Sequence, residues 1–310
     1  MCSSGRVHPP GLFDRSRKST ENTAPQLPEL SLGPSDTIRV PEDPYSPEVT
    51  AATYELRFGK GARPPRRLEN KSDLSQLAVR PPREDKRYIP YLENCRKAME
   101  LFEDACPEAL VGGPWSIAVG LRGIEDLVFD TVDDPEFVHS LMRFTTEISK
   151  QRGEALAGTG VRMVIGDPSC SCSLISPKIY RDFVKPYHKE LADLFNSLGA
   201  SIALHICGYT DPIMEDLVEL DIETIEIDAE SSLERIVQIS QGRVVIRGNF
   251  SNELFIYGNK DEVEEAVKRC IDIAAKGSGY ILSPGCVVPH NIKLENLKFF
   301  IEAAHKYGRY

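Results

Sequence analysis

Short apolar runs alternate along the chain with longer segments whose apolar residues recur at helical spacing. Most of the runs are nearly continuously apolar, which is typical of parallel strands that are covered on both faces. We expect strands at residues 36–40, 109–113, 161–166, 201–207, 224–228, 244–249 and 279–283.

The segments between these runs have the amphipathic pattern of helices. We expect helices at residues 91–105, 134–157, 177–198, 210–220, 231–240, 260–276 and 291–306. Alternating strands and helices indicate an α/β fold with a parallel sheet. Seven such units are one short of a TIM-type (β/α)8 barrel, so we expect a barrel that lacks or substitutes its first strand.

The first 35 residues differ from the rest of the chain. They are rich in Ser and Pro, with several Arg, and show little periodicity, so we expect residues 1–35 to be a flexible N-terminal arm. Residues 36–310 then form the barrel domain. The arm has no apolar segment of the kind found in a secretory signal, so we expect a cytoplasmic protein.

Charge and composition narrow the function classes. The chain has 310 residues, with 37 Lys and Arg against 47 Asp and Glu, a net charge of −10. No basic stripe alternates with aromatics and no apolar stretch is long enough for a membrane, so neither nucleic acid nor membrane is an expected partner. In a reducing compartment, the eight cysteines are better candidates for metal binding or catalysis than for disulfides.

Two strand ends carry soft metal ligands. His205 and Cys207 are two residues apart on one predicted strand and therefore point to the same face. Cys286 follows the last predicted strand, in the segment Ser-Pro-Gly-Cys. Because the carboxyl ends of barrel strands surround one mouth, the three side chains can converge there. A set of one His and two Cys leaves a fourth position open, as in catalytic zinc sites, and sulfur favours zinc over magnesium or calcium.

Other polar residues also follow strands at this mouth. Asp167 and Asp228 each end a strand and are candidates for completing the zinc coordination, orienting His205 or contacting substrate. Asn249 is a further polar group there. Cys170 and Cys172 have the same spacing as the His-x-Cys pair but lie in a loop, where packing is the favoured role. His188 lies in a predicted helix near two lysines and is expected to be solvated or to cap the helix.

His-Ile-Cys-Gly at 205–208 together with Ser-Pro-Gly-Cys at 283–286 resembles the uroporphyrinogen decarboxylase superfamily, in its corrinoid-linked methyltransferase branch. The supporting segments lie at residues 112–123, 164–186, 246–250 and 283–304. This branch includes the methylcobalamin:coenzyme M methyltransferases. The likeness runs from about residue 36 to the C-terminus, and the family's extra N-terminal stretch with its first strand is not matched by residues 1–35.

The resemblance implies a TIM-type barrel whose zinc is held by His205, Cys207 and Cys286. It also implies a thiol acceptor bound to that zinc and a methyl-cobalamin carried by a partner corrinoid protein. Asp228 lies where the similar zinc site of cobalamin-independent methionine synthase carries an acidic ligand, so it ranks above Asp167 as fourth ligand or acid.

Three alternatives stay open at the level of sequence. One is a substrate-specific demethylase that methylates reduced corrinoid from a methoxy or amine donor, with zinc acting as a Lewis acid. Another is porphyrin decarboxylation, against which the Arg-rich motif of true uroporphyrinogen decarboxylases is missing. The last is a barrel that binds a corrinoid protein or ligand without turnover.

Overall fold

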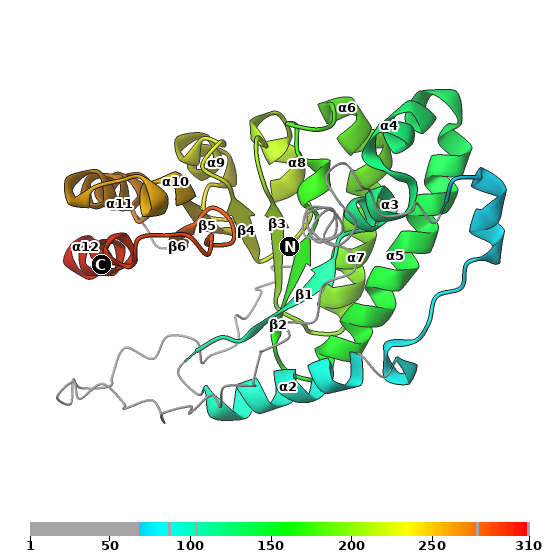
Figure 1. Cartoon of the computed structure of the whole chain (residues 1–310), viewed down its shortest axis with the longest axis horizontal. Coiled ribbons are helices and arrows are strands. Elements are labelled where there is room, and N and C mark those ends of the chain that lie inside the picture. Colours follow the sequence, from blue (N-terminus) through cyan, green and yellow to red (C-terminus); the bar gives the residue numbers. More distant parts are fainter. Residues whose placement is uncertain (1–67, 86–87, 103–104, 277–278, 309–310) are drawn as a thin grey trace, which may run out of the picture. The chain divides into compact units, whose positions relative to one another are not determined.

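The computed structural model describes residues 68–85, 88–102, 105–276 and 279–308. The predicted arm at 1–35 and the predicted strand at 36–40 lie outside these residues. Within them the chain forms one parallel sheet whose strands follow one another in sequence order (Figure 1). The strands are β1 (Glu108–Gly112), β2 (Arg162–Gly166), β3 (Ile202–Ile206), β4 (Thr224–Ile227), β5 (Val245–Phe250) and β6 (Tyr280–Pro284).

Each of the other six predicted strands is present, with its ends shifted by at most one residue. The runs are strands because burial on both faces suits their apolar side chains: Met163 and Ile165 on one face of β2 and Val164 on the other, for instance, are all buried. The shifts matter at the ends, since Cys207 and Asp228 lie one residue beyond β3 and β4. Both side chains therefore stand on the first turn after a strand.

The sheet curls into a barrel. In a flat sheet β1 and β5 would lie about 19 Å apart, because neighbouring strands are spaced by about 4.8 Å. Instead Arg247 on β5 donates hydrogen bonds to both carboxylate oxygens of Glu108 on β1, at 2.6 and 2.7 Å. The two strands therefore face each other across an interior. The predicted fold class, an α/β barrel of the TIM type, is confirmed.

Helices cover the outside of the sheet. Those described are α2 (Tyr88–Leu101), α3 (Pro114–Arg122), α4 (Ile124–Asp133), α5 (Pro135–Ala157), α6 (Pro177–Ile179), α7 (Lys185–Ser197), α8 (Met214–Val218), α9 (Leu233–Ser240), α10 (Asn252–Ile256), α11 (Lys260–Ala274) and α12 (Leu294–Tyr307). Figure 1 shows α5 and α7 beside β1 to β3 and α11 beside β5 and β6, in agreement with the packing contacts, while α12 packs against α11. Among the described residues, no helix has the length and apolarity needed to cross a membrane.

Shorter helical turns complete the described part. They are the 3-10 turns η1 (Lys71–Gln76), η2 (Pro82–Glu84), η3 (Pro168–Cys170) and η5 (Asp211–Ile213), and the π turn η4 (Tyr180–Val184).

Several helices begin at side chains that cap them. The carboxylate of Asp134 accepts from the backbone N–H of Phe137 at the start of α5. Asn259 and Glu262 form a reciprocal capping box at the start of α11. These caps satisfy N–H groups of the first turn that have no partner within the helix.

The helices differ from the sequence-based expectation in two respects. The single helix predicted over 177–198 is divided by the π turn, whose wider winding lets Tyr180, Phe183 and Val184 all be buried. The helices α3 and α4 were not predicted. Seven of the nine residues of α3 are buried, so it lacks the polar face on which an amphipathic pattern depends.

Candidate metal centre

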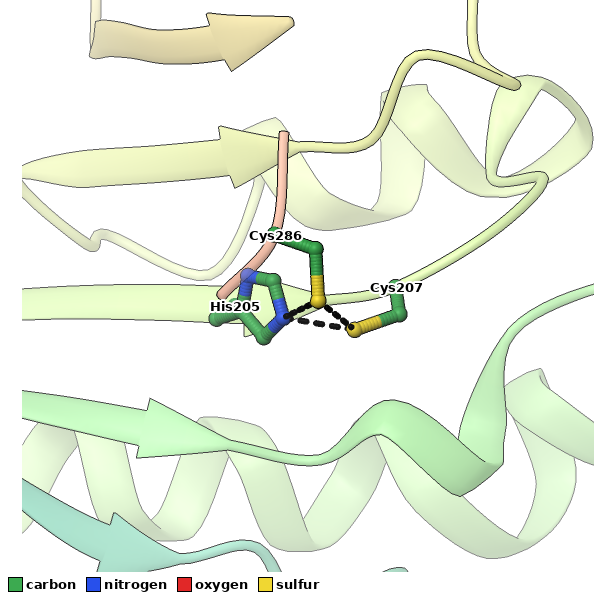
Figure 2. Close-up of side chains that lie close together, drawn as sticks. All are labelled: His205, Cys207 and Cys286. Atoms are coloured by element: carbon green, nitrogen blue, oxygen red, sulfur yellow. Dashed lines mark hydrogen bonds between the residues drawn. The ribbon is translucent and has the colours of Figure 1, made fainter. Parts of the chain in front are cut away.

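His205, Cys207 and Cys286 come together at the carboxyl end of the sheet (Figure 2). Nε2 of His205, on β3, lies 2.7 Å from Sγ of Cys207 and 3.9 Å from Sγ of Cys286. The two sulfur atoms are 3.2 Å apart, although 79 residues separate them in the sequence. All three side chains are partly buried. The structure therefore gathers the predicted ligand set in one place.

The turn that carries Cys207 is held from the neighbouring strand. Gly208 has a φ of +82°, a conformation that residues other than glycine rarely adopt. Its N–H donates to Oδ2 of Asp228 at 3.1 Å, and its carbonyl accepts from the hydroxyl of Ser231 at 2.9 Å. These bonds fix where the chain leaves β3, and with it the position of the Cys207 sulfur.

The loop that carries Cys286 is fixed in the same way. The N–H of Gly285 donates to the carbonyl of Phe250, at the end of β5. The side-chain amide of Asn252 donates to the carbonyls of Cys286 and Val287 at 3.3 and 3.0 Å. A Cβ on Gly285 would lie 2.9 Å from the Cα of Asp228, so only glycine permits this close approach of the two loops.

The three donor atoms suit a zinc ion. They all lie within 4.8 Å of one another. A tetrahedral zinc ion separates a nitrogen and two sulfur ligands by roughly 3.5–3.8 Å, which small side-chain movements would reach from the observed distances. One imidazole and two sulfurs are also a donor set that zinc prefers over magnesium or calcium. The residues present therefore fit the metal that the resemblance implies.

The site favours a thiolate beside an imidazolium when no metal is bound. Hydrogen bonds with Cys207 and His205 outweigh burial and lower the pKa of Cys286 to about 5. Burial would lower the pKa of His205, but its contacts with Cys286 and Glu226 outweigh burial and raise this pKa to about 9. A thiolate is the form in which cysteine binds a metal.

The remaining face of His205 contacts a buried carboxylate. Oε1 of Glu226, on β4, lies 2.8 Å from Nδ1 of His205, and the two side chains are 12% and 14% exposed. Glu226 also forms an ion pair with Arg247 on β5. Burial would raise the pKa of Glu226, yet these two neighbours together lower it. The ring nitrogen that faces away from the sulfurs is thus next to an ionised carboxylate.

The two predicted catalytic carboxylates do not join the three ligands. Asp228 is half-buried and turns its oxygens toward backbone N–H groups, those of Gly208 and Ala229. Asp167 is fully buried. Its oxygens accept from the N–H and hydroxyl of Ser116 and from the N–H of Trp115, at 2.6–3.1 Å. It therefore holds the first turn of α3.

Asp167 belongs to a second cluster, with Cys170 and His188. Nε2 of His188, on α7, lies 2.9 Å from Oδ2 of Asp167, and both side chains are fully buried. The expectation that His188 is solvated or a helix cap was therefore wrong. Cys170 is also buried, and its thiol donates to the backbone carbonyl of Asp167. Asn249, the further polar group expected at the mouth, lies outside both clusters; its side-chain amide donates to the carbonyl of Ser231.

Most of the chain matches a known protein family. The family model described as uroporphyrinogen decarboxylase (URO-D) matches residues 35–307. The chain belongs to the uroporphyrinogen decarboxylase family. A solved methyltransferase from Methanosarcina mazei superposes with a TM-score of 0.68 at 24% identity, covering 76% of this chain and 70% of that one. This likeness supports the barrel fold.

Relatives of this family member include both methyltransferases and decarboxylases. A methylated-thiol–coenzyme M methyltransferase of M. mazei is 28% identical over 203 residues, 63% of this chain and 51% of the relative. A methylcobamide:CoM methyltransferase of Methanosarcina barkeri is 25% identical over the same length and is covered to 56%. The chain thus spans about half the length of these two. A uroporphyrinogen decarboxylase of Anaeromyxobacter dehalogenans is 22% identical over 247 residues, 78% of this chain and 70% of the relative.

Glu226 and Arg247 were not predicted from the sequence as residues of the site. In this family member both are charged residues flanked by apolar ones within a strand, in Ile-Glu-Ile and Ile-Arg-Gly. A charged residue inside a buried strand is rarely left without a partner, and this was the available signal. The partner itself became visible only with the strand register, which aligns His205 with Glu226 and Glu226 with Arg247.

Proposed function

We propose that this protein is a zinc-dependent methyltransferase that moves a methyl group between a corrinoid and a small thiol. The observation that carries the proposal is the meeting of His205, Cys207 and Cys286 at the carboxyl end of the barrel strands. Family relatives that are named as methyltransferases acting on coenzyme M or methylcobamide support it. We further propose that the corrinoid arrives on a partner protein and that the enzyme works in the cytoplasm.

Each ligand residue has a defined part in this chemistry. His205 presents Nε2, and Cys207 and Cys286 present sulfur, from loops that the hydrogen bonds described above hold in place. When bound there, zinc lowers the pKa of a coordinated thiol, so that the substrate is held as the nucleophilic thiolate. Three protein ligands leave room for that substrate.

Apolar side chains flank the ligand loops. Leu174, Tyr209 and Val287 are 55%, 41% and 83% exposed, and the last two stand within two residues of a ligand cysteine. We infer that they shield the thiolate and the transferred methyl from water, which strengthens the charge interactions at the site.

The catalytic roles predicted for Asp228 and Asp167 remain predictions. For Asp228 we propose a positioning role, because its carboxylate orients the Gly208 turn next to Cys207. For Asp167, which is fully buried, we propose that it acts on the site through the packing of α3.

The test is transfer of methyl from methylcobalamin to a panel of small thiols that includes coenzyme M, followed by the loss of methylcobalamin absorbance. Replacing Cys207 by Ser should abolish transfer and most zinc binding, because a hydroxyl is a poor ligand for zinc in this setting. The control is Cys106→Ser, since Cys106 is exposed and lies outside the cluster. Unchanged turnover in Cys207→Ser would contradict the proposed mechanism.

The relatives named as uroporphyrinogen decarboxylases support one alternative, decarboxylation of a porphyrinogen. Assaying the wild-type protein with uroporphyrinogen separates the two reactions. Transfer from methoxy or amine donors to reduced corrinoid, measured in parallel, distinguishes the opposite direction of methyl transfer. We expect methyl transfer to the thiol and no decarboxylation.

A further inference from the structure

A line of alternating charges leads away from the candidate metal centre through the barrel interior. The strand register places His205 on β3, Glu226 on β4 and Arg247 on β5 side by side. Because residues in register on parallel strands point to the same face, the three side chains meet. Glu108 on β1 continues the line from across the interior, through its two hydrogen bonds from Arg247.

These residues are held tightly enough to orient one another. The side chains of His205, Glu226 and Arg247 are 12–14% exposed, and that of Glu108 is 29% exposed. Each neighbour in the line has the opposite charge or, for His205, places Nδ1 of the ring 2.8 Å from a carboxylate oxygen. Arg162 on β2 adds a second positive charge 3.6 Å from Glu108. Burying a charged group costs less free energy when an oppositely charged partner is held beside it.

The contact with Glu226 determines which nitrogen of the His205 ring carries the proton. An ionised carboxylate can only accept a hydrogen bond, so the proton of the neutral ring is placed on Nδ1, next to Glu226. Nε2, which faces the sulfur of Cys207 at 2.7 Å, then carries the free lone pair that a metal requires. In other metal sites, a carboxylate behind a ligating histidine orients the ring and raises the basicity of its nitrogen.

We infer that Glu226, supported by Arg247 and Glu108, is a positioning residue that selects the metal-binding tautomer of His205 and aims its Nε2 at the two cysteine sulfurs. The inference rests on the proposed zinc site and deepens it. It assigns Arg247 a specific part as well. As a planar donor that contacts both glutamates, Arg247 holds the carboxylate of Glu226 in place beside His205.

The test compares zinc affinity, by competition with a chromophoric chelator, in wild type and the Glu226→Gln variant. Gln has the size of Glu but lacks its charge, and loss of such a partner typically weakens metal binding about 10- to 100-fold. The matched control is Glu223→Gln. Glu223 immediately precedes β4 and also pairs with an arginine, Arg162, but no contact joins it to His205. We expect the control to bind zinc as the wild type does.

A second measurement starts from the wild-type protein, whose spectrum alone reports which ring nitrogen of His205 carries the proton. In the zinc-loaded wild-type protein with ¹⁵N-labelled histidine, the ring of His205 should carry its proton on Nδ1 and bind metal through Nε2. A residue with only a structural role would leave this spectrum unchanged when mutated, whereas Glu226→Gln should shift the Nδ1 resonance. This measurement also covers the case in which Glu226→Gln fails to fold.

The possible results distinguish the proposed zinc site from the positioning role of Glu226. A wild-type chain that binds no zinc overturns the proposed function. A wild-type chain that binds zinc, together with a folded Glu226→Gln variant of equal affinity, overturns the positioning role and leaves the metal site intact. Metal bound through Nδ1 of His205 overturns it too. A weakened Glu226→Gln variant beside an unchanged Glu223→Gln control supports it.

Discussion

Replacing Asp167 tests whether this carboxylate supports the fold or takes part in chemistry. It is fully buried and lies between two helices that flank the barrel. Its oxygens accept from the N–H groups of Trp115 and Ser116 at the start of α3 and contact Nε2 of His188 on α7. A carboxylate at the N-terminal end of a helix is also stabilised by the helix dipole. Asp167 thus joins α3, α7 and the end of β2.

The size of the effect follows from the groups left without partners. In the Asp167→Ala variant the two N–H groups of α3 lose their acceptor, at about 1–3 kcal/mol for each buried donor left unsatisfied. The hydroxyl of Ser116 and Nε2 of His188 lose their buried partner as well, at a similar cost for each. Since these terms describe one network and do not add, we expect the free energy of unfolding to fall by about 3–5 kcal/mol. Asp167→Asn keeps one oxygen acceptor and should lose about 1–3 kcal/mol.

Urea unfolding followed by circular dichroism measures this change. Asp228→Asn is the matched control, because Asp228 also follows a strand but is only half-buried, and its unfolding free energy should change by less than about 1 kcal/mol. Methyl transfer is measured on the same preparations below the unfolding transition. Wild-type stability of Asp167→Ala combined with a loss of turnover would refute the structural reasoning and favour the catalytic role predicted from sequence.

Two further predictions concern the metal centre. Gly285→Ala should weaken zinc binding, because its Cβ would lie 2.8–3.1 Å from backbone atoms of Asp228 and Ala229 and would displace the Cys286 loop. Gly120→Ala, on α3 with no atom within 4 Å of the added Cβ, should bind zinc normally; equal affinities for both variants would argue against the tight loop contact. Zinc should also raise the melting temperature of the wild-type protein, since a ligand at 100 times its Kd stabilises the folded state by about 2.7 kcal/mol. Chelation should reverse the increase, and a melting temperature that is insensitive to zinc would count against a folded-state site.

Much of the sheet could be predicted because its signal is local. A strand such as Ile202–Ile206 is an apolar run bounded by turns, and burial on both faces leaves few other structures for it. The ligand set could also be predicted, because the parity of residues along β3 and the common mouth of barrel strands are general rules. His205, Cys207 and Cys286 needed no knowledge of side-chain packing.

Features that depend on contacts between distant elements could not be predicted in this way. Glu226 reaches His205 only through the register of β3 and β4. His188 looked solvated because its helix carries lysines, yet it is buried with the carboxylate of Asp167 as its partner. In both cases a partner far away in the sequence determines the environment of the residue.

The central claim is a zinc ion held by His205, Cys207 and Cys286, and metal content tests it most directly. The purified, chelator-washed protein is analysed by elemental mass spectrometry beside Cys286→Ser and the exposed-cysteine control Cys106→Ser. We predict about one zinc per chain in the wild type and in the control, and its loss in Cys286→Ser. A folded wild-type protein without zinc, or a Cys286→Ser variant that retains the full amount, would contradict the account.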